Sequence, residues 1–361
     1  MMVKLLAFYL PQFHTIPEND TWWGKGFTDW TNVARAKPLF RGHYQPHIPA
    51  DLGFYDLRVP EVREAQADLA REYGIHGFCY YHYWFHGQRL LHRPLDEVLA
   101  SGRPDFPFCL CWANESWTRA WDGRTSDILV EQTYSEQDDI EHIRWLAGVF
   151  EDNRYIRYQG KPVFLIYRAS QMKDPLKTTS MWRQEARRLG IGELLLARVE
   201  SMLGERTFPW EVGCDVGVEF QPNWSQLGPP LHRERGWRLA AKVGLGDKAY
   251  QSHRIYQYSM LMERALQSPS PGYPRFRCVT PSWDNSPRRE QDAVVFHGST
   301  PALYEQWLAA VIDRDRALAE EDRLLFINAW NEWGEGNHLE PDLRYGHAYL
   351  EATKRALRER K

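Results

Sequence analysis

The sequence of 361 residues predicts an α/β fold, a (β/α)8 barrel that occupies the whole chain, residues 1–361, as a single catalytic domain. Short apolar runs, typical of parallel strands buried on both faces, alternate eight times with amphipathic stretches of helical period. Right-handed strand–helix units close into a barrel after eight strands. The predicted strands are Lys4–Tyr9, Gly77–Trp84, Phe106–Trp112, Pro162–Tyr167, Glu193–Val199, Val216–Phe220, Arg275–Thr280 and Leu324–Ala329.

The intervening helices follow from apolar residues that recur every three or four positions. Ser135 stands three residues before Asp138 and is a suitable N-cap for the second helix. The helices are predicted at Glu61–Glu72, Glu136–Phe150, Met181–Leu189, Ile255–Leu266, Pro301–Ala317 and Ala348–Leu357.

A doubly wound open sheet is the main alternative arrangement of these elements. Such a sheet normally carries a Gly-rich phosphate turn after an early strand, but here the first apolar run leads into Leu10-Pro11-Gln12-Phe13-His14. Two connections are unusually long, residues 11–59 after the first strand and residues 222–248 after the sixth. Long loops in compact barrels are commonly functional.

Charge and hydropathy exclude several classes of partner. Lys and Arg total 45 against 48 Asp and Glu, and a net charge of −3 offers no broad basic field for nucleic acid or anionic lipid. No stretch reaches the roughly 18 apolar residues of a membrane span, and Leu5–Leu10 is too short for a signal sequence. We therefore expect a cytoplasmic protein, unless a leader precedes this sequence. Its oligomeric state is not predicted.

Aromatic residues make up 14% of the chain and include 16 Trp. Planar rings stack on the C–H faces of sugars, and carboxylate and amide groups bind vicinal hydroxyls. In a barrel, such groups act at the carboxyl ends of the strands. The residues predicted there to bind an oligosaccharide or polysaccharide are Tyr9, His14, Trp30, Tyr81, His82, Trp84, Trp112, Asn114, Glu115, Tyr167, Glu219, Trp283, Asp284, Trp330, Asn331 and Trp333.

The segment Asn331-Glu332-Trp333-Gly334-Glu335-Gly336 directly follows the eighth strand. Two carboxylates three residues apart, beside glycines that permit a tight bend, can share a cavity and acquire unequal pKa values, as cleavage of a glycosidic bond requires. We therefore predict Glu332 and Glu335 as catalytic residues. The alternative, a pair of solvated surface glutamates, would expose the neighbouring tryptophans.

Three further carboxylates, those of Glu115, Glu219 and Asp284, are weaker candidates. Ion pairs with Arg119, Arg168 or Arg198 are an equally good account of them.

No cofactor and no metal is predicted. His82 and His86 have helical spacing but lie on or beyond a strand, and neither a His-Glu-x-x-His nor a Cys-x-x-Cys pattern is present. The five cysteines, an odd number placed mostly in apolar runs, are expected to be reduced and buried. The sequence contains no Gly-x-Ser-x-Gly motif and therefore gives no indication of a serine hydrolase.

Five motifs together resemble the WbsX-like proteins. They are Tyr9-Leu10-Pro11-Gln12-Phe13-His14, Trp23-Gly24-Lys25-Gly26-Phe27-Thr28-Asp29-Trp30, Tyr80-Tyr81-His82-Tyr83-Trp84-Phe85, Trp112-Ala113-Asn114-Glu115 and the glutamate segment above. That group is often labelled as glycosyltransferases of O-antigen or lipopolysaccharide synthesis, and it is similar to glycoside hydrolase family 99, the endo-α-mannosidases and endo-α-mannanases.

The resemblance implies roles for the two glutamates. Glu335 would protonate the departing oxygen and later activate water. Glu332 would deprotonate the sugar's own 2-hydroxyl, which attacks the anomeric carbon and gives a 1,2-anhydro intermediate with net retention. No separate protein nucleophile is then needed beneath the anomeric carbon.

Other features differ from the hydrolase group, so the sugar and its linkage do not transfer. Examples are the long first loop and the basic Pro287-Arg288-Arg289 segment. Arg288 and Arg289 could bind an anionic sugar or a diphosphate, or they could be solvated surface residues. Two alternatives to a hydrolase stay open. A glycosyltransferase would need a diphosphate site, but no Asp-x-Asp follows a strand. A carbohydrate-binding barrel would lack activity altogether.

Overall fold

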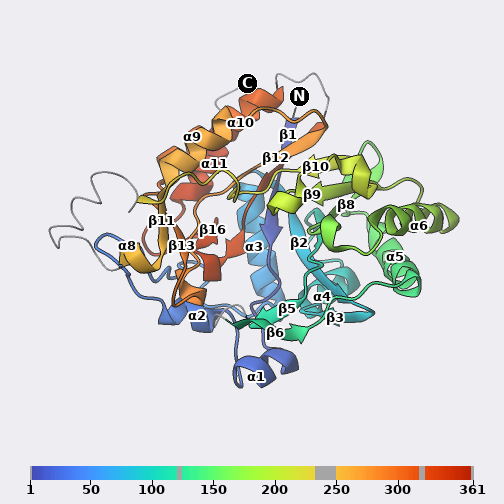
Figure 1. The fold of residues 1–361 in the computed structure, drawn as a ribbon, viewed down its shortest axis with the longest axis horizontal. Coiled ribbons are helices and arrows are strands. Elements are labelled where there is room, and N and C mark those ends of the chain that lie inside the picture. The colour runs from blue at the N-terminus through green and yellow to red at the C-terminus, as the bar shows by residue number, and fades with distance from the viewer. Residues whose placement is uncertain (1, 120–123, 232–248, 317–321, 359–361) are drawn as a thin grey trace.

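Eight parallel strands form a closed barrel in the computed structural model, which describes residues 2–119, 124–231, 249–316 and 322–358. Strand β1 pairs with both β14 and β2, and this double pairing closes the ring (Figure 1). The predicted (β/α)8 barrel and all eight predicted strands are therefore confirmed. The barrel strands are β1 (Met2–Tyr9), β2 (Ile75–Phe85), β4 (Phe108–Trp112), β8 (Lys161–Ile166), β9 (Leu195–Val199), β10 (Val216–Val218), β12 (Arg275–Val279) and β14 (Asp322–Ile327).

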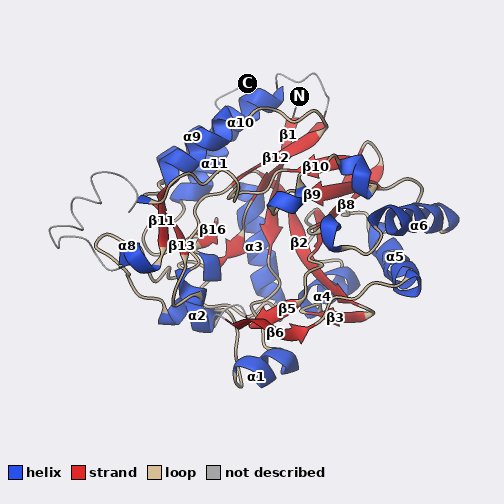
Figure 2. Cartoon of the chain, viewed as in Figure 1, coloured by secondary structure: helices blue, strands red, loops and turns tan. Residues whose placement is uncertain are grey.

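Helices surround the strands (Figure 2). The Ser135 side chain accepts a hydrogen bond from the Asp138 amide and caps its helix as predicted. The main helices are α3 (Pro60–Glu72), α4 (Arg93–Ser101), α5 (Glu136–Phe150), α6 (Pro175–Arg188), α9 (Tyr258–Gln267), α10 (Pro301–Arg316) and α11 (Ala348–Arg358). Among the described residues, none of these helices has the length and apolar character needed to cross a membrane.

Two predicted helix starts are wrong. Helix α6 begins six residues before the predicted Met181, because Asp174 caps it and Pro175 suits its first turn. The stretch predicted as helical from Ile255 first forms strand β11 (Arg254–Gln257), which pairs with β13 (Val294–His297), and helix α9 begins only at Tyr258. A short apolar run does not distinguish a strand from a helical turn.

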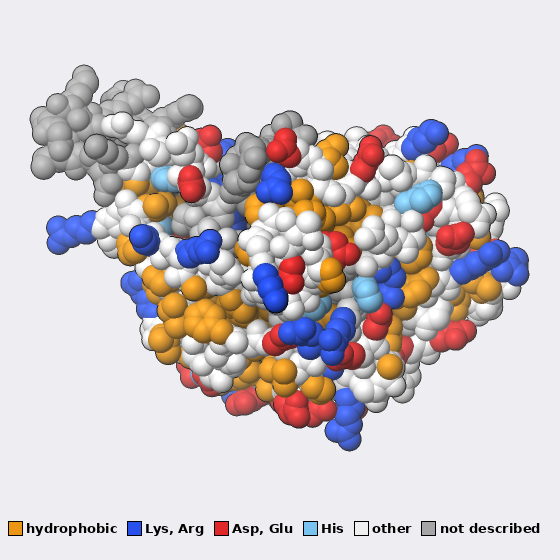
Figure 3. All heavy atoms as spheres, turned by 90° about the horizontal axis from the view of Figure 1, so that it is seen from below, with side chains coloured by type: hydrophobic (Ala, Val, Ile, Leu, Met, Phe, Trp, Pro, Cys, Tyr) orange, Lys and Arg blue, Asp and Glu red, His pale blue; other side chains and the backbone are white. Residues whose placement is uncertain are grey.

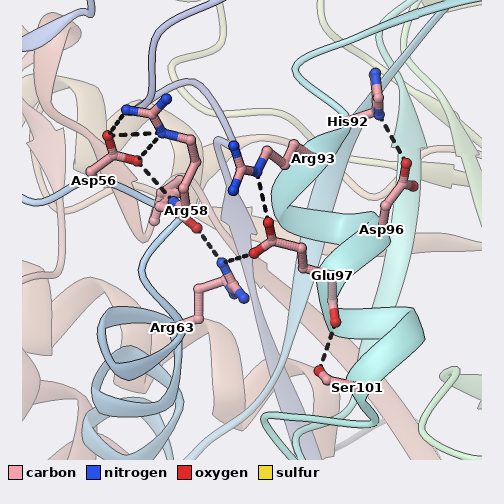
Figure 4. A network of polar contacts seen from close by, with 9 residues as sticks. Asp56, Arg58, Arg63, His92, Arg93, Asp96, Glu97 and Ser101 are labelled. Atoms are coloured by element: carbon pink, nitrogen blue, oxygen red, sulfur yellow. Dashed lines mark hydrogen bonds and ion pairs between the residues drawn. The ribbon is translucent and has the colours of Figure 1, made fainter.

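The first βα connection carries helices α1 (Pro17–Trp23) and α2 (Trp30–Arg35) at the carboxyl end of the strands (Figure 1). Its return to α3 is held by a network of charged groups (Figure 4). Arg63 binds Glu97 on α4 (2.8 Å), and Arg58 pairs with Asp56 (2.6 Å). This network fixes the base of a loop that reaches into the site described below.

Smaller elements complete the description. They are β3 (Gln88–Leu90), the hairpin β5 (Trp117–Arg119) and β6 (Arg124–Val130), β7 (Arg157–Tyr158), α8 (Ala249–Ser252), and the pair β15 (Asn331–Glu332) and β16 (Asn337–His338). The predicted irregular segment 222–248 lies mostly outside the described residues. All five cysteines are free and buried, as expected.

Candidate active site

The carboxyl ends of the barrel strands open into a cavity of about 300 Å³. Figure 3 shows the molecule from the side to which these strand ends point, where acidic, basic and hydrophobic side chains lie close together. The cavity is lined by Leu10, Gln12, Asn19, Trp23, Phe27, Asp29, Tyr81, Tyr83, Leu91, Ala113, Glu115, Ser116, Trp117, Thr118, Leu129, Tyr167, Phe220, Trp283, Arg288, Asn328, Glu332 and Glu335.

Both predicted catalytic glutamates reach this cavity from the loop after β14. Glu332 ends the short strand β15, and Glu335 ends the 3-10 turn Trp333–Glu335 that follows. The side chain of Glu332 is 9% exposed and that of Glu335 is 21% exposed. Neither lies on the solvated surface, and Trp330 and Trp333 beside them are fully buried.

One buried guanidinium holds the two glutamates together. Arg288 Nη2 lies 2.6 Å from Glu332 Oε1, and Arg288 Nη1 lies 3.3 Å from Glu335 Oε1. The same arginine binds Asp29 on the first loop, with Nη2 2.6 Å from Oδ2 and Nε 3.2 Å from Oδ1. Gln12 Nε2 also donates a hydrogen bond to Asp29 Oδ2 (2.9 Å). Three carboxylates thus surround one cation in a site largely screened from water.

Burial is the main influence on the protonation of the pair. It raises the pKa of Glu332 to about 8, with the charges of Glu335 and Asp29 acting in the same direction and Arg288 opposing them. Burial likewise raises the pKa of Glu335, again against Arg288. Because the two carboxyls interact, their protons belong to the pair. Burial therefore favours the protonated form of both carboxyls, and a pair that shares one proton offers one acid and one base.

Gly334 stands between the glutamates because nothing larger fits there. A Cβ at this position would lie 2.1 Å from Asp29 Oδ2 and 2.6 Å from Arg288 Nε. The close approach of the loop backbone to the Asp29–Arg288 pair therefore requires a residue without a side chain.

We expect Gly334→Ala to destabilise the fold by about 1–3 kcal/mol, the usual cost of overpacking a tight interior. The free energy of unfolding in urea measures this. Gly148→Ala is the matched control, because Gly148 lies within α5 and a Cβ there meets nothing within 4 Å. Alanine favours a helix over glycine, so the control should be neutral or more stable. Equal stability of the wild type and Gly334→Ala would contradict the close packing.

The raised pKa of Glu332 also predicts how stability depends on pH. Between about 4.5, its ordinary value, and about 8, the folded chain binds more protons than the unfolded chain, so stability falls as the pH rises. The loss is about 1.4 kcal/mol for each pH unit separating the two pKa values. Glu332→Gln should flatten this decline, measured as the free energy of unfolding at pH 5 and pH 8.

Glu72→Gln, at an exposed position on α3, is the control for this experiment and should keep the wild-type slope. An unchanged slope in Glu332→Gln would show that Glu332 does not titrate abnormally.

Six of the residues predicted from the sequence line the cavity: Tyr81, Glu115, Tyr167, Trp283, Glu332 and Glu335. Glu115 also forms the predicted alternative, an ion pair with Arg168. Tyr81 enters the barrel mouth together with Tyr83, which the prediction omitted. Side chains alternate along a strand, and this explains why their neighbours on β2 do not share the cavity.

The other predicted residues are buried but do not line the cavity: Tyr9, His14, Trp30, His82, Trp84, Trp112, Asn114, Glu219, Asp284, Trp330, Asn331 and Trp333. Several hold the scaffold. His82 lies 3.0 Å from His142 (Nε2 to Nε2), and the Trp84 indole donates to Asp138 (2.8 Å). Asn331 binds the backbone of Leu10 through both its amide atoms.

Two carboxylates outside the cavity lining have partners other than those proposed for them. Glu219 lies 3.9 Å from both Arg275 and Arg277. Asp284 pairs with His43 (2.7 Å), and this contact lowers the pKa of Asp284 against the effect of burial.

Two charged residues of the site were not assigned their place from the sequence. Asp29 was noted only as part of the motif of residues 23–30, with no role of its own. Arg288 was considered for an anionic sugar, a diphosphate or the solvated surface, but the structure buries it against three carboxylates. The sequence did contain one indication of the position of Arg288. This basic residue lies in the loop after the seventh strand, and that loop is next to the glutamate loop in a barrel. The lining residues Gln12, Asn19, Trp23, Phe27, Trp117 and Asn328 were not among the predicted binding residues.

Comparison with known families identifies this architecture. The family described as "Glycosyltransferase WbsX" matches residues 5–353. The chain belongs to the WbsX family. As a member of this family, the chain is classed with carbohydrate-active enzymes.

Relatives and solved structures agree with this placement. The chain is 46% identical over 354 residues to WxcX, an uncharacterized protein of Xanthomonas campestris pv. campestris, in strain B100 and in strain ATCC 33913. These matches cover 98% of this chain and 49% of each relative, so the chain spans about half the length of the curated relatives it matches.

Solved structures share the fold at 16% identity. A glycoside hydrolase-like protein superposes with a TM-score of 0.60 and covers 98% of this chain and 93% of its own. A GH99 endo-α-mannosidase from Bacteroides thetaiotaomicron superposes with a TM-score of 0.54 and covers 98% and 96%. At this identity the likeness shows the fold of the WbsX chain and nothing further.

Proposed function

We propose that this WbsX-family chain is a retaining glycoside hydrolase that cleaves an α-glycosidic bond in an oligosaccharide or polysaccharide. The observation that carries the proposal is the shared cavity of Glu332 and Glu335, bound to one arginine and both with a raised pKa. A glycosidase needs an acid and a base on the same bond, and a pair that retains one proton supplies both.

The roles of the glutamates follow the motif. Glu335 is the more exposed of the two and donates its proton to the departing oxygen, then accepts a proton from water. Glu332 takes the proton of the sugar's 2-hydroxyl, whose oxygen bonds to the anomeric carbon as the glycosidic bond breaks. In this proposal the proton of the pair lies on Glu335 when the substrate binds, and the raised pKa makes the carboxylate of Glu332 a stronger base. Water then attacks the anomeric carbon and opens the 1,2-anhydro ring while Glu332 returns its proton to the 2-oxygen, and the product retains its anomeric configuration.

The rest of the cavity suits a neutral sugar. Tyr81, Tyr83, Tyr167, Trp117 and Trp283 provide rings on several sides of the cavity. Aromatic faces stack on sugar rings, and their hydroxyl and indole groups reach hydroxyls. The cavity volume of about 300 Å³ lies at the lower end of the range for small-molecule sites.

A glycosyltransferase is the second candidate, and the family name favours it. The charge of the cavity argues against a nucleotide-sugar diphosphate. Arg288 is already bound to three carboxylates, and Arg168 to Glu115 and Glu205. An incoming diphosphate would meet the acidic groups Asp29, Glu115, Glu332 and Glu335 at the cavity wall.

The test is a screen of bacterial surface polysaccharides and α-mannans for released reducing sugar, with and without nucleotide-sugar donors. Glu335→Gln should lower turnover by about 100-fold or more, since a positioned acid contributes about 10²–10⁴-fold, while an oligosaccharide still binds. Glu115→Gln should lower turnover less, because Glu115 lies in the same cavity but is ion-paired with Arg168. A donor-dependent transfer without hydrolysis would support the transferase, and sugar binding with no activity would support a binding barrel.

The intermediate makes a separate prediction. A substrate whose 2-hydroxyl is replaced by hydrogen cannot form the 1,2-anhydro ring, so the wild-type chain should bind it without cleaving it. The measurement compares release from the two substrates, and nuclear magnetic resonance identifies the first anomer released. Cleavage of the 2-deoxy substrate at the normal rate would exclude this role for Glu332.

A further inference from the structure

A second, smaller cavity of about 90 Å³ lies beside the active site. Trp283 lines both cavities. The first βα loop contributes one wall through His43, Tyr44 and His47, and the segment after β16 contributes another. Apart from Trp283, the proposed hydrolase uses none of the groups that line the smaller cavity, although several of them are buried and able to bind a ligand.

Three such groups converge at its wall. His47 Nδ1 lies 2.8 Å from His338 Nε2, and His338 Nε2 lies 3.8 Å from Asp342 Oδ2. All three side chains are buried, and their ligand atoms lie within 4.8 Å of one another. We propose that His47, His338 and Asp342 bind a divalent transition-metal ion such as Zn²⁺. Two imidazoles and a carboxylate form an established ligand set for this class of ion.

The ligand atoms are oriented in advance. His338 Nδ1 donates to the Glu340 carbonyl (2.9 Å), which fixes the tautomer that leaves a lone pair on Nε2. Such an outer hydrogen bond is typical of metal-binding histidines. Asp342 Oδ1 accepts the amides of Arg344 (2.8 Å) and Tyr345 (2.7 Å), while Oδ2 is the atom nearer His338.

Ring stacking restricts both imidazoles. His338 stacks on Trp333 with the centroids 3.7 Å apart, and His47 stacks on Tyr44 at 4.1 Å. Burial favours the neutral form of each ring, which is the form that coordinates a metal. Rigid, neutral rings lose little freedom when an ion binds.

A hydrogen bond between the two histidines explains the separation of 2.8 Å with no ion bound. Zinc–nitrogen bonds of about 2.0–2.1 Å place two ligands roughly 3.3 Å apart at a tetrahedral angle. Because His338 Nε2 carries a lone pair, His47 Nδ1 donates this hydrogen bond. Binding therefore requires the rings to separate by about half an ångström and the proton of His47 to move from Nδ1 to Nε2, so that the ion takes its place. The adjoining cavity leaves room for water as the fourth ligand.

The proposed ion would connect two parts of the protein that form the active site. His47 belongs to the loop that carries Asp29, and His338 packs on Trp333 between the catalytic glutamates. The site would stabilise the arrangement of these loops. It takes no part in bond cleavage, so its existence does not depend on the proposed hydrolase activity.

Another buried histidine pair shows what the three-residue cluster adds. His82 and His142 also lie within hydrogen-bonding distance, Nε2 to Nε2 at 3.0 Å. Among the described residues, however, the cluster at His47 is the single group of three or more potential ligands close enough to share an ion. The carboxylate of Asp342 therefore distinguishes the cluster at His47 from the pair of His82 and His142.

The test uses the tag-free full chain, dialysed against a chelator, and needs no substrate. Calorimetric titration with ZnCl₂ should show one ion bound per chain, and Co²⁺ should give the visible absorption of nitrogen and oxygen coordination. His47→Gln and Asp342→Asn should each weaken binding by more than about 100-fold, because losing even an outer partner costs 10–100-fold. Zn²⁺ should raise the melting temperature of the wild type but not that of the two ligand variants.

His297→Gln is the matched control, because His297 lines the same cavity outside the cluster, and it should bind Zn²⁺ like the wild type. Circular dichroism shows whether each variant folds. If a ligand variant fails to fold, the wild-type titration and Co²⁺ spectrum still decide. Absence of Zn²⁺ binding by the wild type, or equal binding by the folded ligand variants, would overturn the proposal.

Discussion

The contact of Arg288 with three carboxylates is the constraint on which the site depends. Glu332 and Asp29 are almost completely buried, and a buried carboxylate without a partner is strongly destabilising. One guanidinium cannot neutralise three negative charges. The remaining imbalance is reduced when the glutamate pair keeps a proton, which is the direction in which burial moves the pKa of both. Burial, whose effect on the pKa Arg288 only partly offsets, therefore favours an acid in this site.

The barrel brings these charges together although they are far apart in the sequence. Strands β1, β14 and β12 are consecutive neighbours in the sheet. Asp29 follows β1, the two glutamates follow β14, and Arg288 follows β12. Parallel strands deliver their following loops to the same end of the barrel, so adjacent strands place adjacent loops in contact. The network is therefore a property of strand order, and its members need no proximity in the chain.

This strand order explains how much of the site could be predicted from the sequence. Apolar runs identified all eight barrel strands, because burial on both faces leaves a strong local pattern, and the glutamate motif follows the last of them directly. The same reasoning collected every polar or aromatic residue near a strand end. His82 was included with Tyr81 although neighbours on a strand face opposite sides. The partners of Arg288 follow from contacts across 44 and 259 positions, and no local pattern records such contacts.

The choice between hydrolase and transferase depends on the same charges. The family name points to transfer, and the chain spans about half the length of the curated relatives it matches. Arg288, which lines the cavity, and Arg168 beside Glu115 are bound to carboxylates of the chain itself. A diphosphate would have to displace these carboxylates and leave them buried beside its own negative charge, whereas a neutral sugar adds no charge and leaves Arg288 with Asp29 and the glutamates. The electrostatics of the cavity therefore favour a substrate without phosphate.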